Sequence, residues 1–146
     1  MYPKPIEFYY APTSVGETLT LLKEHRGTAK LLAGGQSLVP LLKLRLVEPR
    51  CLIDLNRIAG LADIREEQES LCLGAMARHA DMAKHPTIRR TYSLLAEAAQ
   101  GIGDLQVRNR GTMGGSLVHA DPCADYPAAV MALDGRLVLT LSLIHI

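Results

Sequence analysis

The sequence predicts an α+β protein of two subdomains, a small parallel βαβ subdomain followed by a mixed, largely antiparallel α+β subdomain. Two observations predict this class. Residues 1–57 alternate short apolar strands with amphipathic helical segments, which is the pattern of a parallel sheet with crossover helices. Two strand-like segments then follow around a polar turn, which is the pattern of an antiparallel hairpin. We therefore expect subdomains over residues 1–57 and 58–140.

Capping and turn residues divide the first half into its elements. Ser14 and Glu17 fit a capping box at the start of a helix that Gly27 ends. Ser37 is expected to cap a second helix, which runs through Leu46. The strands expected around these helices are 8–10, 29–32 and 51–55.

The second half is predicted to begin with the hairpin, whose strands 61–64 and 71–73 are joined by a solvated acidic turn at 66–70. Glycines and short polar residues indicate a loop over 106–125. The apolar run 137–146 is expected to form a last strand, whose unpaired edge would favour aggregation. The helices expected between these segments are 80–84, 94–99 and 128–133.

Composition excludes several classes of function. Sixteen Lys and Arg against 15 Asp and Glu give a formal net charge of +1. The chain therefore lacks the excess of basic residues that is typical of nucleic-acid-binding proteins. The three cysteines are far apart and form no CxxC pair, so neither a metal site nor a disulfide framework is predicted. No signal peptide is visible, and the longest apolar run is too short to span a bilayer. We expect a cytoplasmic protein without an integral membrane segment.

Two Gly-Gly pairs carry most of the chemical information. Gly34–Gly35 is followed by Gln36 and Ser37, and Gly114–Gly115 is followed by Ser116. Glycine permits close backbone approach to phosphate oxygens, and successive amides form a concavity that binds anions. Two such segments suit a pyrophosphate. The alternatives are a non-catalytic nucleotide- or phosphate-binding module, and a scaffold domain in which both pairs are tight turns.

The remaining polar residues are predicted to be structural. Neither a P-loop motif nor a Rossmann GxGxxG motif is present. Four potential ligands alternate between positions 119 and 125, but hydrogen bonding within a loop is favoured over a metal site. Arg108 and Arg110 could hold the second glycine segment by bonding its carbonyls or could face an anion, and the structural role is favoured. His79 and His85 are expected to be structural or surface residues. No catalytic triad is visible, so a bound cofactor would supply any redox chemistry.

The segments 33–38 (AGGQSL) and 108–116 (RNRGTMGGS), followed by 119–122 (HADP) and Asp125, resemble the FAD-binding medium subunits of molybdenum hydroxylases. Carbon monoxide, xanthine and aldehyde dehydrogenases belong to this group. The resemblance implies a truncated two-subdomain FAD-binding fold of the vanillyl-alcohol-oxidase (PCMH) type, with FAD between the subdomains.

The resemblance also implies which residues bind FAD. Residues 30–37 would contact the adenine, ribose and pyrophosphate. Thr112, Gly114, Gly115 and Ser116 would contact the second phosphate and the ribityl chain. Asp125 would bond the ribityl or flavin side, with Gly103 near the same path. The implied FAD-binding residues are Lys30, Leu31, Leu32, Ala33, Gly34, Gly35, Gln36, Ser37, Gly103, Thr112, Gly114, Gly115, Ser116 and Asp125.

A subunit of this kind implies partners. The expected function is that of an FAD-dependent oxidoreductase subunit, which passes electrons from an iron–sulfur subunit through FAD to an acceptor. The expected partners are a large molybdenum-cofactor subunit and a small iron–sulfur subunit, in a heterotrimer that dimerises. Family subunits are longer than this chain, and residues 141–146 do not resemble the family continuation. We therefore expect an N-terminal part of such a subunit, with a non-native tail at 141–146.

Overall fold

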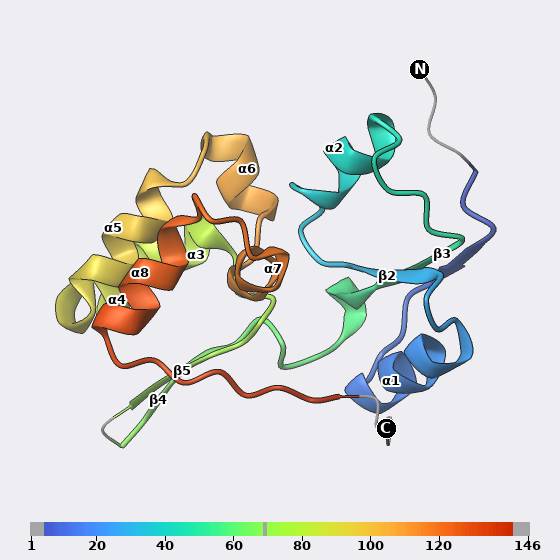
Figure 1. The fold of residues 1–146 in the computed structure, drawn as a ribbon. Coiled ribbons are helices and arrows are strands. Elements are labelled where there is room, and N and C mark those ends of the chain that lie inside the picture. The colour runs from blue at the N-terminus through green and yellow to red at the C-terminus, as the bar shows by residue number, and fades with distance from the viewer. Residues whose placement is uncertain (1–4, 69, 142–146) are drawn as a thin grey trace. The chain divides into compact units, whose positions relative to one another are not determined.

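The computed structural model describes residues 5–68 and 70–141 and is drawn in Figure 1. The chain divides into two compact units. The first unit contains the chain up to Ala59 together with the stretch from Val138 onward, and the second unit contains Gly60–Leu137. Each unit has its own sheet and helices. In the described residues, no helix has the length and apolar character needed to cross a bilayer.

A three-stranded parallel sheet forms the centre of the first unit. Its elements are β1 (Phe8–Tyr10), α1 (Val15–Glu24), β2 (Ala29–Leu32), α2 (Leu38–Lys43), β3 (Cys51–Asp54) and the 3-10 helix η1 (Leu55–Arg57). The strand order is β1–β3–β2, so the third strand of this sheet in chain order is the central one. Cys51, Leu52 and Ile53 of this central strand are buried. The parallel sheet predicted for this half is confirmed.

The cap of α1 is nearly the predicted one. Oγ of Ser14 accepts a hydrogen bond from the backbone N–H of Glu17 at 3.1 Å. The Glu17 carboxylate accepts in return from the N–H of Thr13 at 2.9 Å, one residue before the predicted donor. Both bonds satisfy amides at the start of the helix, which is the physical purpose of a capping box.

Helix α2 differs from its prediction at both ends. The Ser37 side chain makes no capping hydrogen bond. The helix ends at Lys43 rather than at Leu46, because Arg45 adopts a left-handed conformation with φ of 55°. The predicted helix was too long because the left-handed residue that ends it is an arginine and not the glycine that commonly follows a helix.

The second unit combines one hairpin with a group of helices. Its elements are β4 (Ile64–Glu67), β5 (Ser70–Leu73), α3 (His79–Lys84), α4 (Pro86–Thr91), α5 (Ser93–Gly101), α6 (Leu105–Arg110), α7 (Met113–His119) and α8 (Asp125–Ala132). Helices α3, α5 and α8 pack together. Their core cluster, joined by residues of neighbouring segments, is Ala77, Met82, Ile88, Leu95, Ala96, Ala99, Met113, Tyr126 and Ala129.

The hairpin is antiparallel as predicted, but its first strand lies further along the chain. Ile64 pairs with Leu73 and Glu67 pairs with Ser70, so charged residues assigned to the turn belong to β4. The prediction followed apolar residues, whereas this strand is mostly exposed and tolerates charge. The Thr87 hydroxyl donates to the Glu66 carboxylate, and Glu69 lies outside the described residues.

The expected loop over 106–125 is wrong, because α6 and α7 lie there. The Asp104 carboxylate caps α6 by accepting from the N–H of Val107 at 2.8 Å. Thr112 caps α7 in the same manner. Glycine lowers helix propensity by about 1 kcal/mol relative to alanine, which makes the glycine-rich part of this segment look like a loop. The caps and tertiary contacts outweigh that penalty.

The expected last strand is also wrong in the part that the structure describes. Residues 137–141 form no strand, and Val138 is 93% exposed. A strand requires a neighbour to pair with its backbone, and apolar composition alone does not supply one. The rest of that segment, with residues 142–146 of the expected tail, lies outside the described residues.

Pro86 was expected only to end a helix, but it is the first residue of α4.

Candidate functional site

The first glycine segment, residues 33–37, lies between β2 and α2. Gly35 has a φ of +77°, a conformation that glycine adopts at little steric cost. Its carbonyl accepts from the N–H of Val39 at 2.9 Å, which leads the chain into α2. A Cβ at position 35 would lie 3.2 Å from Cγ2 of Val39 and 3.4 Å from Cδ1 of Leu32. Backbone conformation and tight neighbours both favour glycine here.

Four consecutive amides of this segment have no acceptor within the described part of the chain. They are the backbone N–H groups of Gly34, Gly35, Gln36 and Ser37. The Gln36 side chain instead donates from Nε2 to the carbonyl of Gly34 at 3.3 Å. A run of amides without partners after a strand is suited to anionic oxygens. This segment therefore fits the phosphate groups of a nucleotide cofactor.

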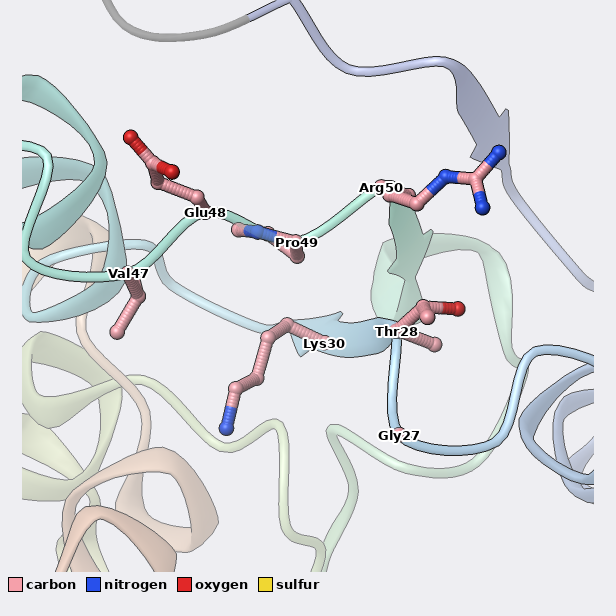
Figure 2. A pocket seen from close by; sticks show the side chains of 8 residues that line it. Gly27, Thr28, Lys30, Val47, Glu48, Pro49 and Arg50 are labelled. Atoms are coloured by element: carbon pink, nitrogen blue, oxygen red, sulfur yellow. The ribbon is translucent and has the colours of Figure 1, made fainter.

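Lys30, Leu31 and Leu32 belong to β2, and Lys30 lines a cavity of about 370 Å³. The other lining residues come from 27–29 and 47–50, so this cavity lies at the amino ends of β2 and β3 (Figure 2). The side chains of Lys30 and Val47 extend in the same direction. The glycine segment follows the opposite, carboxyl end of β2. The predicted residues 30–37 therefore occupy both ends of the strand.

Arg50 at this cavity is engaged by Glu7. Its Nε and Nη2 atoms lie 2.9 Å and 2.6 Å from the two carboxylate oxygens, which is a bidentate arrangement. The hydrogen bonds from Arg50 lower the pKa of the Glu7 carboxyl. The positive charge of the Arg50 guanidinium is thus compensated by the Glu7 carboxylate, which directly precedes β1.

The second glycine pair lies in the first turn of α7 and not in a loop. Oγ1 of Thr112 accepts from the N–H of Gly115 at 3.2 Å, and the Thr112 carbonyl accepts from Ser116 at 3.0 Å. The N–H of Gly114 donates to the carbonyl of Ala75 at 2.9 Å. The amides of this segment therefore have acceptors within the chain, whereas those of residues 34–37 have none among the described residues.

Close approach of two backbones explains the glycine at position 114. A Cβ there would lie 2.6 Å from Cβ of Ala75 and 2.7 Å from its carbonyl oxygen. The N–H of Met113 also donates to the carbonyl of Ala77 at 3.0 Å. The start of α7 is thus fixed against the segment that precedes α3.

Gly103 and Asp125 lie on other elements of the second unit. Gly103 has a φ of +47° and follows α5. Nη1 of Arg108 donates to its carbonyl at 2.7 Å and to that of Ile102 at 3.0 Å. Arg108 therefore bonds carbonyls, as the favoured role predicted, but those of the turn between α5 and α6 and not those of the second glycine segment. Asp125 is exposed in the first turn of α8, and Ala124 is the N-cap residue.

The segment 119–125 forms the expected loop hydrogen bond. Oδ1 of Asp121 accepts from the N–H of Cys123 at 2.8 Å. Among residues 5–68 and 70–141, no group of three or more His, Cys, Asp or Glu side chains is placed to hold a metal ion.

Comparison with known families identifies the family of the chain. The model of the FAD binding domain in molybdopterin dehydrogenase matches residues 4–142. The chain belongs to this family. The predicted resemblance and FAD as its cofactor are therefore confirmed.

Individual members of the family are close in sequence. The chain is 48% identical to the carbon monoxide dehydrogenase medium chain of Hydrogenophaga pseudoflava, over 95% of this chain and 48% of the relative. It is 47% identical to the 6-hydroxypseudooxynicotine dehydrogenase complex subunit alpha of Paenarthrobacter nicotinovorans, over 90% of this chain and 45% of the relative. The chain thus spans about half the length of the curated relatives it matches.

A solved structure confirms the fold class. Carbon monoxide dehydrogenase from Hydrogenophaga pseudoflava matches with a TM-score of 0.87 and 50% identity, over 90% of this chain and 46% of that one. The FAD-binding fold of this family accounts for the α+β class and for the combination of a parallel sheet with an antiparallel hairpin.

One buried pair in this FAD-binding domain was not predicted as a feature of the site. Nδ1 of His79 lies 2.9 Å from Oη of Tyr126, and both side chains are buried. Burial lowers the pKa of His79 to about 4 and raises the pKa of Tyr126. The N–H of His79 donates to the carbonyl of Gly111 at 3.1 Å, just before Thr112. These residues are 47 positions apart, and no local sequence signal connects them.

Proposed function

We propose that this chain is the N-terminal part of an FAD-binding electron-transfer subunit of a molybdenum hydroxylase. In this role it holds FAD, which accepts electrons from an iron–sulfur partner and passes them to an acceptor. The activity is that of an FAD-dependent oxidoreductase component. The proposal is supported by the dehydrogenase names of the relatives and by the family match over residues 4–142.

One observation carries the proposal: the amides of Gly34–Ser37, in a domain of an FAD-binding family, have no acceptor among the residues that the structure describes. These amides would hold phosphate oxygens of FAD, with Gly35 keeping side-chain atoms out of the approach. Residues Lys30–Ala33 would contact the adenine and ribose side.

The second unit would contribute side chains more than amides. The amides of residues 114–116 are already bonded, so Ser116 would act through its hydroxyl and Asp125 through its exposed carboxylate. Thr112, Gly114 and Gly115 would set the position of Ser116, and Gly103 would lie along the same path. This division assigns the pyrophosphate mainly to residues 1–57 and the ribityl side to residues 58–140.

The proposed partners follow from the relatives. Their names describe medium chains and lettered subunits of dehydrogenase complexes. We assign to this chain a large molybdenum-cofactor subunit and a small iron–sulfur subunit, in a heterotrimer that dimerises. Cys51, Cys72 and Cys123 are free thiols, which supports a reducing, cytoplasmic location.

FAD titration of the purified protein tests the function. We expect saturable one-to-one binding, with quenching of flavin fluorescence and absorbance bands in the visible region. Thermal stabilisation by ADP without any stable flavin complex would instead indicate a nucleotide-binding module. Absence of a response to FAD in the protein together with its partner subunits would overturn the proposal.

A further inference from the structure

We propose that Asn56 is a positioning residue for the Gly34–Gly35 segment, and that Asp54 and Tyr9 hold Asn56 in place. This inference rests on the proposed role of residues 34–37 in binding the phosphates of FAD. It concerns side chains on β1, β3 and η1 that do not belong to the glycine segment itself.

The contact to the glycine segment is made by the Asn56 amide. Its Nδ2 atom donates to the carbonyl of Ala33 at 3.1 Å, directly before Gly34. The same nitrogen lies 2.5 Å from Oδ1 of Asp54. A carbonyl and a carboxylate only accept hydrogen bonds, so the –NH₂ group of Asn56 must face both. Both of its N–H groups are therefore used, and the side-chain amide has one permitted orientation.

Asp54 is itself held from two sides. Its Oδ1 also accepts from the backbone N–H of Asn56 at 2.9 Å, which begins the 3-10 helix η1. Its Oδ2 accepts from the hydroxyl of Tyr9 at 2.5 Å. This hydrogen bond favours the protonated phenol and raises the pKa of Tyr9. A continuous chain of hydrogen bonds thus runs from Tyr9 through Asp54 and Asn56 to Ala33.

The parallel sheet explains why these residues meet. Leu32 pairs with Asp54 and Tyr10 pairs with Ile53, so the three strands end at one edge of the sheet. Asp54 ends the central strand, where Tyr9 of β1 donates to its carboxylate and Asn56 links it to Ala33, the residue after β2. The carbonyl of Ala33, directly before the amides of residues 34–37, is thus held by a side chain from outside the glycine segment.

The test compares isosteric and truncated variants. Asn56→Asp places an acceptor against the carbonyl of Ala33 and the carboxylate of Asp54, and should raise the Kd for FAD by about tenfold. Asn56→Ala should raise it by about fivefold, and Tyr9→Phe by about twofold. Gln100→Glu makes the same amide-to-acid change on an exposed position of α5 and should leave the Kd unchanged.

Two further readouts separate positioning from a general loss of structure. Asn56 and Tyr9 are exposed, so the Tm of the apoprotein should move little in their variants. Tyr9→Phe should have no added effect in the Asn56→Ala background, because the chain of bonds is already broken. Affinity for riboflavin, which has no phosphate, should be the same in wild type and variants.

The outcomes distinguish the two proposals. Failure of the wild-type protein to bind FAD would overturn the proposed function. Wild-type binding with an unchanged Kd in Asn56→Asp would overturn the positioning role alone. Equal losses of FAD and riboflavin affinity, accompanied by a lower Tm, would likewise contradict it, since they indicate a structural role only.

Discussion

The imidazole of His79 is joined to the hydroxyl of Tyr126 across 2.9 Å in the core of the second unit. The Tyr126 hydroxyl also donates towards Sδ of Met82 at 3.6 Å. His79 starts α3 and Tyr126 lies in the first turn of α8, so the pair links two helices. Asp125 is the neighbour of Tyr126, and Gly111 accepts from the backbone of His79. The pair therefore supports both segments proposed to face the ribityl side of FAD.

The buried imidazole predicts that stability depends on pH. The pKa of His79 is lowered from 6.5 to about 4 by burial first and by Arg78 second, while Asp125 opposes the shift. Between these values the unfolded state binds more protons than the folded state, so stability falls as pH falls from 6.5 to 4. The full effect is on the order of 3 kcal/mol. Thermal unfolding followed by circular dichroism from pH 7.5 to 4 measures it.

His79→Gln is the control for this prediction. It removes the titrating group while keeping a polar side chain able to reach Tyr126. The variant should be less stable at pH 7.5, and its Tm should fall less steeply between pH 6.5 and 4. An unchanged slope would assign the pH dependence to other groups.

Local signals predicted much of the first unit. The Ser14–Glu17 cap and the strands before Gly34 and at Cys51 depend on residues close in sequence, and each was found near its predicted place. The left-handed turn at Arg45 was not predicted because the sequence has no glycine at that position to indicate it. Local pattern therefore served best where side chains bond to the backbone beside them.

The two Gly-Gly pairs show where local pattern is insufficient. Gly34–Gly35 lies in a turn whose amides have no acceptor in residues 5–68 and 70–141, whereas Gly114 lies in a helix that packs closely against Ala75. The identical dipeptide serves two purposes because a segment almost 40 residues away supplies the acceptor for one of them. Only tertiary structure distinguishes them, as it does for the His79–Tyr126 pair.

Gly35→Ala should weaken FAD binding. The left-handed φ costs about 1 kcal/mol for a residue with a Cβ, and that atom would press on Val39. We expect a raised Kd for FAD in fluorescence titration and a slightly lower Tm. Gly27→Ala is a matched control, because Gly27 has a φ of +75° and nothing within 4 Å of its Cβ position. It should lower the Tm similarly without changing the Kd, and equal effects on Kd would contradict the assignment.

Gly114→Ala should destabilise the second unit. The added methyl would lie within 3 Å of the backbone and Cβ of Ala75, which cannot rotate away. Overpacking of this kind costs about 1–3 kcal/mol, measured as a loss of unfolding free energy in urea. Gly16→Ala provides the contrast, because nothing lies within 4 Å of its Cβ position in α1. That variant should be stabilised by about 0.5–1 kcal/mol. A tolerated Gly114→Ala would show that α7 is not held where the structure places it.

Loss of the Thr112 cap of α7 is predicted to lower stability and to weaken FAD binding at the proposed site. Its Oγ1 accepts from Gly115 at 3.2 Å, and its side chain is buried. Thr112→Val keeps the shape but removes the acceptor, and should cost about 1 kcal/mol of stability. Because the freed amide loosens the first turn of α7, the Kd for FAD should also rise. Thr112→Ser retains the oxygen and should keep more of the FAD affinity than Thr112→Val. If the valine variant, which keeps the buried methyl and lacks the acceptor, retains more FAD affinity than the serine variant, the methyl of Thr112, rather than its cap, positions Ser116.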